Sequence, residues 1–203
     1  MPLSVSERVC NILLGLNLIA LGIIGLVTSN ELERLSTVRL CITALTMIVG
    51  SLFVCRERLV RSGDIASMLL AVPSIVGGIV VVHFSPPTHL WPTPAVVLFV
   101  VGTIVTVMSL ISLGKCFAIL PAVRSTVERG TYRLVRHPIY LGEFVLVLGC
   151  WLAKPTLNLA WIPIVVLLCI VVRILAEERL LTRTEDYRQY KERVVWRLVP
   201  GVW

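Results

Sequence analysis

Long apolar runs alternate with short polar segments along the whole chain. Six of these runs approach the roughly 20 mostly apolar residues that a helix needs to cross a bilayer. They are Cys10–Thr28, Val38–Cys55, Ile65–Phe84, Pro94–Leu113, Pro138–Ala153 and Thr156–Ala176. The fifth run is the shortest, and Lys154 and Pro155 join it to the sixth as a helical hairpin. The pattern therefore predicts an all-α protein, a polytopic membrane helical bundle with about six transmembrane helices.

The composition indicates a membrane protein and argues against nucleic acid as a partner. Of the 203 residues, 57% are hydrophobic, and the mean hydropathy is +0.90. Both values are high for a soluble domain. The net charge of +7 does not indicate nucleic-acid binding, because the basic residues are distributed between apolar runs and not gathered on one polar domain. The six cysteines are scattered without C-x-x-C spacing, so we predict no disulfide and no metal site.

The basic residues are distributed unequally between the two ends of the predicted spans. With six spans, the N-terminus, the loops 56–64 and 114–137 and the tail after Glu177 share one side, which holds 15 Lys and Arg residues. The other side holds three, which are Arg34, Arg39 and Lys154. Because cytoplasmic loops are enriched in Lys and Arg, we predict that both termini are cytoplasmic.

A polar stretch, Arg136-His137-Pro138, precedes the fifth run on this side. Proline fits the first turn of a helix and disfavours helical geometry in the residue before it, so we predict a helix that begins at Pro138 with His137 as its cap. The unpaired N–H groups and the dipole at such a helix start attract a carboxylate or a phosphate. Gly142, one turn into the helix, would let another group approach the backbone closely.

Two ionisable residues stand out inside the predicted spans, Glu143 in the fifth and Arg173 in the sixth. Such residues are unfavourable in a membrane and usually functional. Each could neutralise the other across the hairpin, or Arg173 could extend to the lipid headgroups. Glu177 follows Arg173 by four residues, so it lies on the same helix face one turn nearer the cytoplasm. That face therefore carries one cation and one anion.

The chain after Glu178 is basic and amphipathic and contains the aromatic residues Tyr187, Tyr190 and Trp196. A segment of this kind lies on a membrane surface. It can also fold over a site as a lid. We therefore predict a cytoplasmic C-terminal amphipathic lid.

Several of these residues form an ordered series of motifs. The series is Gly130-Thr131-Tyr132, Arg136-His137-Pro138-x-Tyr140-x-Gly142, Arg173-x-x-x-Glu177-Glu178, Tyr187-x-x-Tyr190 and Arg197-x-x-Pro200. In order and spacing it resembles the isoprenylcysteine carboxyl methyltransferase family of integral membrane methyltransferases. The resemblance covers about residues 113–203, which would form the catalytic region, and residues 1–112 would be N-terminal spans for packing and substrate access. The family often has Phe-Gly before the first tail tyrosine, where this chain has Thr182-Arg183-Thr184, so the shape of the lid is expected to differ.

The resemblance implies S-adenosylmethionine as the cofactor, bound on the cytoplasmic side between the last two spans. Carried over position by position, it implies cofactor contacts from Arg124, Ser125, Thr126, Val127, Tyr132, His137, Pro138, Ile139, Tyr140 and Glu177. It also implies that Arg173 binds the methyl acceptor and that Arg173 and Glu177 are the catalytic residues. The acceptor would be a lipid or a lipidated small molecule that enters from the bilayer. No metal and no nucleic acid would take part.

Carboxyl methylation is the first expectation, because the Arg173 guanidinium can bind both oxygens of an acceptor carboxylate. An amine acceptor, as in the phospholipid N-methyltransferases, would need a base, for which Glu143 and Glu178 are candidates. A membrane reductase that binds a nicotinamide, similar to the sterol reductases, is a further alternative. A non-enzymatic transporter is another, although transporters usually show polar residues through several spans or an inverted repeat.

Overall fold

The computed structural model describes residues 5–55, 61–62, 85–114, 122–123 and 126–203 of the chain. The predicted span Ile65–Phe84 and the predicted cofactor residues Arg124 and Ser125 lie outside this described part.

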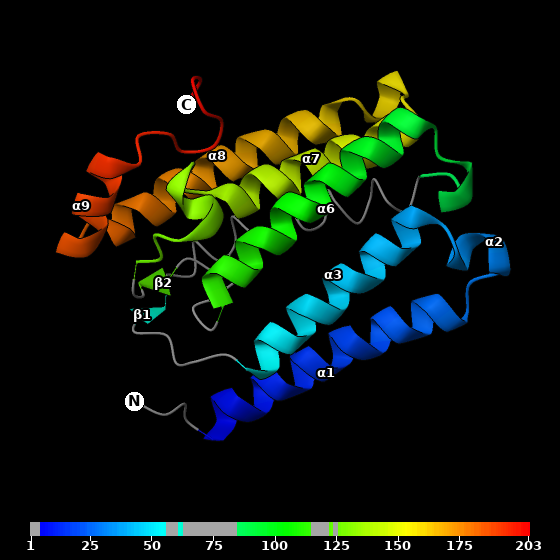
Figure 1. Cartoon of the computed structure of the whole chain (residues 1–203), viewed down its shortest axis with the longest axis horizontal. Coiled ribbons are helices and arrows are strands. Elements are labelled where there is room, and N and C mark those ends of the chain that lie inside the picture. Colours follow the sequence, from blue (N-terminus) through cyan, green and yellow to red (C-terminus); the bar gives the residue numbers. More distant parts are fainter. Residues whose placement is uncertain (1–4, 56–60, 63–84, 115–121, 124–125) are drawn as a thin grey trace.

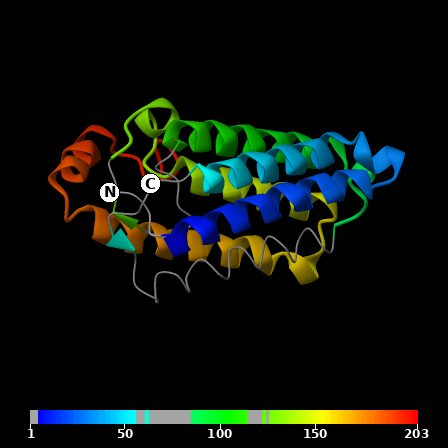
Figure 2. The same ribbon diagram turned by 90° about the horizontal axis from the view of Figure 1, so that it is seen from below.

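Five long helices run alongside one another within the described part of the chain (Figure 1). They are α1 (Val5–Val27), α3 (Thr37–Val54), α6 (Thr93–Leu113), α7 (Pro138–Ala153) and α8 (Trp161–Leu181). Helix α1 packs on α3, α3 on α6, α6 on α7 and α7 on α8. A view turned by 90° also shows α1 and α3 side by side (Figure 2). Helices therefore form over five of the predicted runs, and the prediction of a helical bundle is confirmed.

Short elements connect the long helices. They are α2 (Glu31–Arg34) and the 3-10 helices η1 (Thr88–Leu90), η3 (Gly130–Arg133) and η4 (Leu157–Leu159), and the short helix α9 (Glu185–Arg193) follows α8. The strands β1 (Arg61–Ser62) and β2 (Ala122–Val123) form a small antiparallel pair, which is the one exception to an all-helical fold among the described residues. Helix α9 and the strands lie at one end of the bundle, and α2 lies at the other (Figure 1).

Helix α8 lies further along the chain than the predicted span Thr156–Ala176. The turn η4 occupies the beginning of that run, and Pro163 fits the first turn of a helix that begins at Trp161. The helix then continues through Glu177 and Glu178 to Leu181. Both carboxylates are therefore held on a rigid element.

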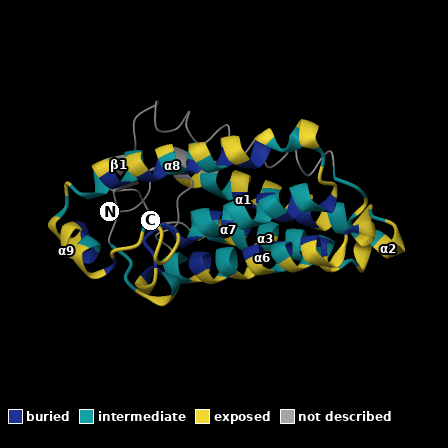
Figure 3. Cartoon of the chain, turned by 90° about the horizontal axis from the view of Figure 1, so that it is seen from above, coloured by how far each residue is buried: buried dark blue, intermediate teal, exposed yellow. Residues whose placement is uncertain are grey.

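Three helical segments of the described residues are long and apolar enough to cross a membrane, and they are Thr37–Val54, Thr93–Leu113 and Leu157–Leu181. The apolar part of α1, Asn11–Val27, and helix α7 are shorter. Many large apolar side chains on α1, α6 and α8 are exposed, among them Leu13, Leu21, Val101, Ile104, Ile164 and Leu168. Exposed positions follow the outer faces of the bundle (Figure 3). Extended apolar surface of this kind indicates contact with a membrane.

Helix α8 turns one stripe of side chains towards the core. Ile162, Val166, Ile170 and Ile174 recur every four residues and are at most 1% exposed. This stripe packs against apolar side chains of α6 and α7 and forms the main core with them.

Helices α6 and α7 approach each other closely at glycines. A Cβ atom at Gly142 would collide with the side chain of Thr106, and it would lie 2.9 Å from the backbone N of Thr106 and 3.1 Å from the backbone O of Gly102. The sequence predicted that Gly142 lets another group approach the backbone, and within the structure that group is helix α6. Gly142 therefore serves helix packing.

A carboxylate joins α2 to η1 at the end of the bundle opposite α9. Oε1 and Oε2 of Glu33 accept hydrogen bonds from the backbone N–H and the hydroxyl of Thr88, both at 2.6 Å. Oε1 also lies 3.3 Å from Nδ1 of His89. Burial raises the pKa of Glu33, but the hydrogen bonds with Thr88 and His89 and the charge of Arg39 outweigh burial, so this pKa lies below its ordinary value. While it is ionised, Glu33 therefore acts as a clamp between α2 and η1.

Replacement of Glu33 by Gln is expected to lower the free energy of unfolding by about 1 to 2 kcal/mol at neutral pH, because hydrogen bonds to a charged group contribute about that much. Since the folded-state pKa is lowered, the wild-type contribution is present above the ordinary value of 4.5 and is lost as the pH falls through the folded-state pKa. Unfolding in detergent, followed at neutral and acidic pH, measures both effects. Glu31→Gln, at an exposed position of α2, is the control. Equal losses in the two variants would contradict the clamp.

Candidate functional site

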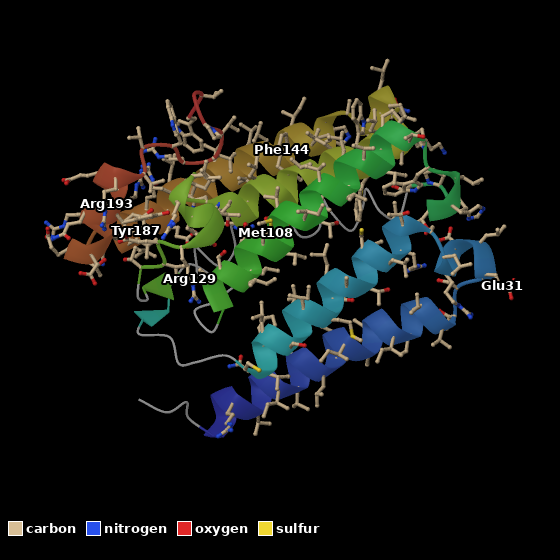
Figure 4. The ribbon with its side chains drawn as sticks, viewed as in Figure 1. Glu31, Met108, Arg129, Phe144, Tyr187 and Arg193 are labelled. Carbon is tan, nitrogen blue, oxygen red and sulfur yellow. The ribbon has the colours of Figure 1, made fainter. Side chains whose placement is uncertain are left out.

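The predicted helix start at Pro138 is confirmed. Pro138 is the first residue of α7 and His137 is its N-cap residue, although the His137 side chain makes no capping hydrogen bond. The η3 segment that leads into this start lies at the α9 end of the bundle. Figure 4 shows Arg129, which directly precedes η3, at the same end as Tyr187 and Arg193 of α9, and Glu31 at the opposite end.

The C-terminal tail pairs with the two residues that precede α7. The backbone N–H groups of Arg136 and His137 donate to the backbone O atoms of Trp196 and Arg197, both at 2.9 Å. The Arg136 guanidinium also donates from Nη1 to the backbone O of Val194 at 2.7 Å. The tail is thus fixed against the start of α7.

Glu178 joins three basic side chains at this junction. Its Oε1 accepts a hydrogen bond from Nε of Arg136 at 2.8 Å and lies 3.4 Å from Nε2 of His137. Its Oε2 accepts a hydrogen bond from Nε of Arg197 at 3.0 Å. The side chains of Arg136 and Glu178 are only 3% and 6% exposed. A buried carboxylate therefore ties α8 to the start of α7 and to the tail.

Sequence reasoning missed this role, because it considered Glu178 only as a candidate base. The helical periodicity contains the signal, since Glu178 follows Ile170 and Ile174 at four-residue spacing and continues their buried stripe. A carboxylate on a buried stripe needs a buried cationic partner. Arg136, which the motif places beside His137, is that partner.

Glu177 contacts Tyr140 of α7 and the N-cap residue His137, which also contacts Glu178. Its Oε2 accepts a hydrogen bond from the hydroxyl of Tyr140 at 3.0 Å and lies 3.8 Å from Nδ1 of His137. The rings of His137 and Tyr140 stack with their centroids 5.7 Å apart. The Glu177 side chain is 24% exposed, so a ligand can reach it. The structure thus brings two of the predicted cofactor residues, His137 and Tyr140, to the carboxylate of a third, Glu177.

Arg173 lies one helical turn before Glu177 and is 4% exposed. Its guanidinium carbon lies 4.7 Å from the centre of the Tyr140 ring. Its Nη1 lies 3.5 Å from Oε2 of Glu143, whose side chain is 26% exposed. Of the two interpretations that the sequence left open for Arg173, the structure shows the pairing with Glu143. Tyr140 contacts both Arg173 and Glu177 and so connects the two candidate catalytic residues.

Tyr132, another predicted cofactor residue, links η3 to α9. It is buried, and its backbone O accepts a hydrogen bond from the hydroxyl of Tyr190 at 2.7 Å. Burial raises the pKa of Tyr190 well above its ordinary value, so the hydroxyl remains a donor. The hydroxyl of Tyr187 is also buried and has no hydrogen-bond partner among the described residues. Helix α9 is therefore anchored to η3 through Tyr190.

Ile139, Thr126 and Val127 are further predicted cofactor residues that the structure describes. Ile139 packs in an apolar cluster with Phe53 of α3 and Leu110 of α6. Thr126 and Val127 are half-buried in the segment that leads to η3. Ile139 therefore contributes to helix packing next to the start of α7.

The arrangement is suited to binding and aligning charged organic groups. The Glu177 carboxylate can hold an ammonium group, and the start of α7 can hold an anion. The Arg173 guanidinium, one turn deeper, can hold a second anionic group. Among the described residues, no group of three or more His, Cys, Asp or Glu side chains is placed to hold a metal ion.

Residues 92–189 match the model of the phospholipid methyltransferase family, which includes membrane methyltransferases similar to the isoprenylcysteine carboxyl type. The match extends from the start of α6 into α9, and it contains the α7 start and the acidic end of α8. No curated protein matches the chain. Residues 92–189, just under half of the chain, therefore carry a domain that matches the phospholipid methyltransferase family.

Proposed function

We propose that this protein is an integral membrane methyltransferase that uses S-adenosylmethionine and acts on a lipid or lipidated acceptor. The family domain over residues 92–189 supports methyl transfer at a membrane, and it favours this activity over the reductase and transporter alternatives. The observation that carries the proposal is the convergence of His137 and Tyr140 on the partly exposed carboxylate of Glu177.

The charges at this place complement the amino-acid end of S-adenosylmethionine. Glu177 would bind its ammonium group, and the hydrogen bond from Tyr140 fixes the orientation of the Glu177 carboxylate. The first turn of α7 has N–H groups without partners inside the helix, and together with the helix dipole and His137 they would bind its carboxylate. When bound, the cofactor supplies an electrophilic methyl group on a positively charged sulfur.

The protein's own contribution is alignment and the exclusion of water. Positive charge is dispersed during methyl transfer, so a dry site that aligns donor and acceptor accelerates the reaction. The tail, which is fixed to Arg136 and His137, would act as the lid that keeps water from this end of the site. Arg173 would position the acceptor beside the ring of Tyr140.

Two acceptor classes fit the deeper part of the site. We place carboxylates first, because the Arg173 guanidinium can bind two oxygens and no proton has to be removed from a carboxylate. An amine-bearing lipid is the second candidate. The contact between Glu143 and Arg173 favours it, because Glu143 supplies a carboxylate that can take the proton an amine must lose.

The distribution of Lys and Arg supports a multi-pass protein with six spans, in which both termini and the cofactor site are cytoplasmic. In this orientation the cofactor would enter from the cytoplasm. The apolar part of the acceptor would enter from the bilayer, between the helices.

Cofactor binding tests the proposal directly. Glu177→Gln and His137→Ala are each expected to weaken the binding of S-adenosylmethionine by about 1 to 3 kcal/mol, because each removes a contact to a charged group. Titration calorimetry on the purified full-length protein in detergent measures this loss. Glu185→Gln is the matched control, because Glu185 on α9 is exposed and pairs only with Arg188 among the described residues. Unchanged affinity in both site variants would refute the proposed cofactor site.

A further inference from the structure

The pair formed by Glu143 and Arg173 lies at the deep end of the candidate site. Glu143 follows Tyr140 by three residues on α7, and Arg173 precedes Glu177 by four residues on α8. At a rise of 1.5 Å per residue, the pair therefore lies about 4.5 to 6 Å further along the helices than the Tyr140–Glu177 contact. It occupies the place where a headgroup would lie if the donor bound at Glu177.

The pair is loose and unequally covered. Its N–O distance is 3.5 Å, which is longer than the 2.7 to 2.9 Å usual for a charge-assisted hydrogen bond. The Arg173 side chain is 5% exposed, whereas that of Glu143 is 26% exposed. The guanidinium is also fixed against the ring of Tyr140. Glu143 is therefore the member of the pair that a ligand can contact or displace.

We infer that Glu143 is a specificity-determining residue that sets the charge preference for the acceptor headgroup. The inference rests on the proposed function and adds that the Glu143 carboxylate competes with the acceptor headgroup for the Arg173 guanidinium. An acceptor carboxylate has to take the place of the Glu143 carboxylate on the guanidinium and meets its repulsion. A cationic headgroup is instead attracted by Glu143 and repelled by Arg173. The balance between the two side chains thus decides which headgroup charge the site accepts.

Binding of a matched series of lipids tests this inference without the cofactor. The series has one farnesyl tail and three headgroups: a carboxylate, its neutral methyl ester and a primary amine. Affinities are measured for the purified full-length protein in detergent. In Glu143→Gln, we expect the ratio of carboxylate affinity to amine affinity to rise at least about tenfold over the wild type, because a charge about 4 Å away is removed. The affinity for the ester should change by less than about twofold, because the headgroup is neutral and Gln keeps the shape of the side chain.

Several results would overturn the inference. One is an unchanged affinity ratio in folded Glu143→Gln, and another is an equal change for all three headgroups, which would indicate altered packing. Failure of the wild type to bind any of the three lipids would show that the headgroup does not lie here. If Glu143→Gln does not fold, Glu143→Asp provides the test. It keeps the charge but withdraws it from Arg173, so the ratio should rise in the same direction by a smaller factor, and an unchanged ratio would overturn the inference.

A second variant identifies the partner for which the headgroup competes. Adding Arg173→Gln to Glu143→Gln should abolish the gain in carboxylate affinity, and a retained gain would overturn the competition for Arg173. Glu185→Gln serves as the control and should leave all three affinities unchanged. These outcomes are separate from the proposed function, which fails if the wild type neither binds S-adenosylmethionine nor transfers its methyl group.

Discussion

Replacing Glu178 by Ala is expected to destabilise the protein by about 3 to 5 kcal/mol, which is the usual effect of leaving a buried charge without its partner. Arg136, with a side chain 3% exposed, would lose its carboxylate, and Arg197 would lose the same partner. The tail would then be held to α7 by fewer contacts. Chemical unfolding of the full-length protein in detergent measures the loss, and limited proteolysis would detect release of the tail.

The control for this experiment is Glu128→Ala. Glu128 and Arg193 pair at 2.6 Å, which is shorter than any contact of Glu178, but their side chains are 37% and 61% exposed. Exposed ion pairs contribute about 0 to 1 kcal/mol, so this variant should be nearly as stable as the wild type. Similar losses in the two variants would show that burial of Glu178 does not determine its contribution.

Gly142→Ala is expected to destabilise the protein by at least about 2 to 3 kcal/mol, because an added methyl group would force α6 and α7 apart. The atoms that the methyl group would meet include the backbone of Thr106 and Gly102, which cannot turn away as a flexible side chain can. The start of α7 would shift with the helix, so cofactor affinity should fall as well. Thermal unfolding and titration calorimetry measure the two effects.

Gly25→Ala is the matched control for this change. Gly25 lies in α1, and a Cβ atom there would meet only Nη1 of Arg39, at 3.4 Å. Because Ala favours a helix over Gly by up to about 1 kcal/mol, this variant should be unchanged or slightly more stable. A Gly142→Ala protein as stable as the control would show that α6 and α7 can separate at little cost.

Local sequence signals predicted the elements that carry the site. Pro138 set the start of α7, because a proline at the first helical position needs no backbone hydrogen-bond partner, and the observed helix covers Pro138–Ala153 as predicted. The start of α8 was less predictable, since the apolar run begins before Trp161 and continuous hydrophobicity does not show where the η4 turn gives way to the helix. A continuous apolar run therefore predicts the presence of a helix more reliably than it predicts the first residue of that helix.

Local sequence patterns did not predict most contacts between segments that are distant in the chain. The clamp between Glu33 and Thr88 joins two connecting segments, and nothing in either segment alone requires the other. The sequence also suggested that the Gly142 backbone could be open to any close neighbour, but the approach of α6 depends on how two helices pack. The pairing of Glu143 with Arg173 was one of the predicted alternatives, because a buried cation and a carboxylate on adjacent spans stabilise each other.

The junction of Glu178 with Arg136 and Arg197 also constrains how the protein can evolve. Because the three charges share their hydrogen bonds, the fitness effect of a substitution at one position depends on the residues at the other two. Relatives with a neutral residue at position 178 should therefore also lack one or both arginines, which an alignment would show as covariation. Drift at these positions would pass through destabilised intermediates, so we expect changes at the three positions to be coupled.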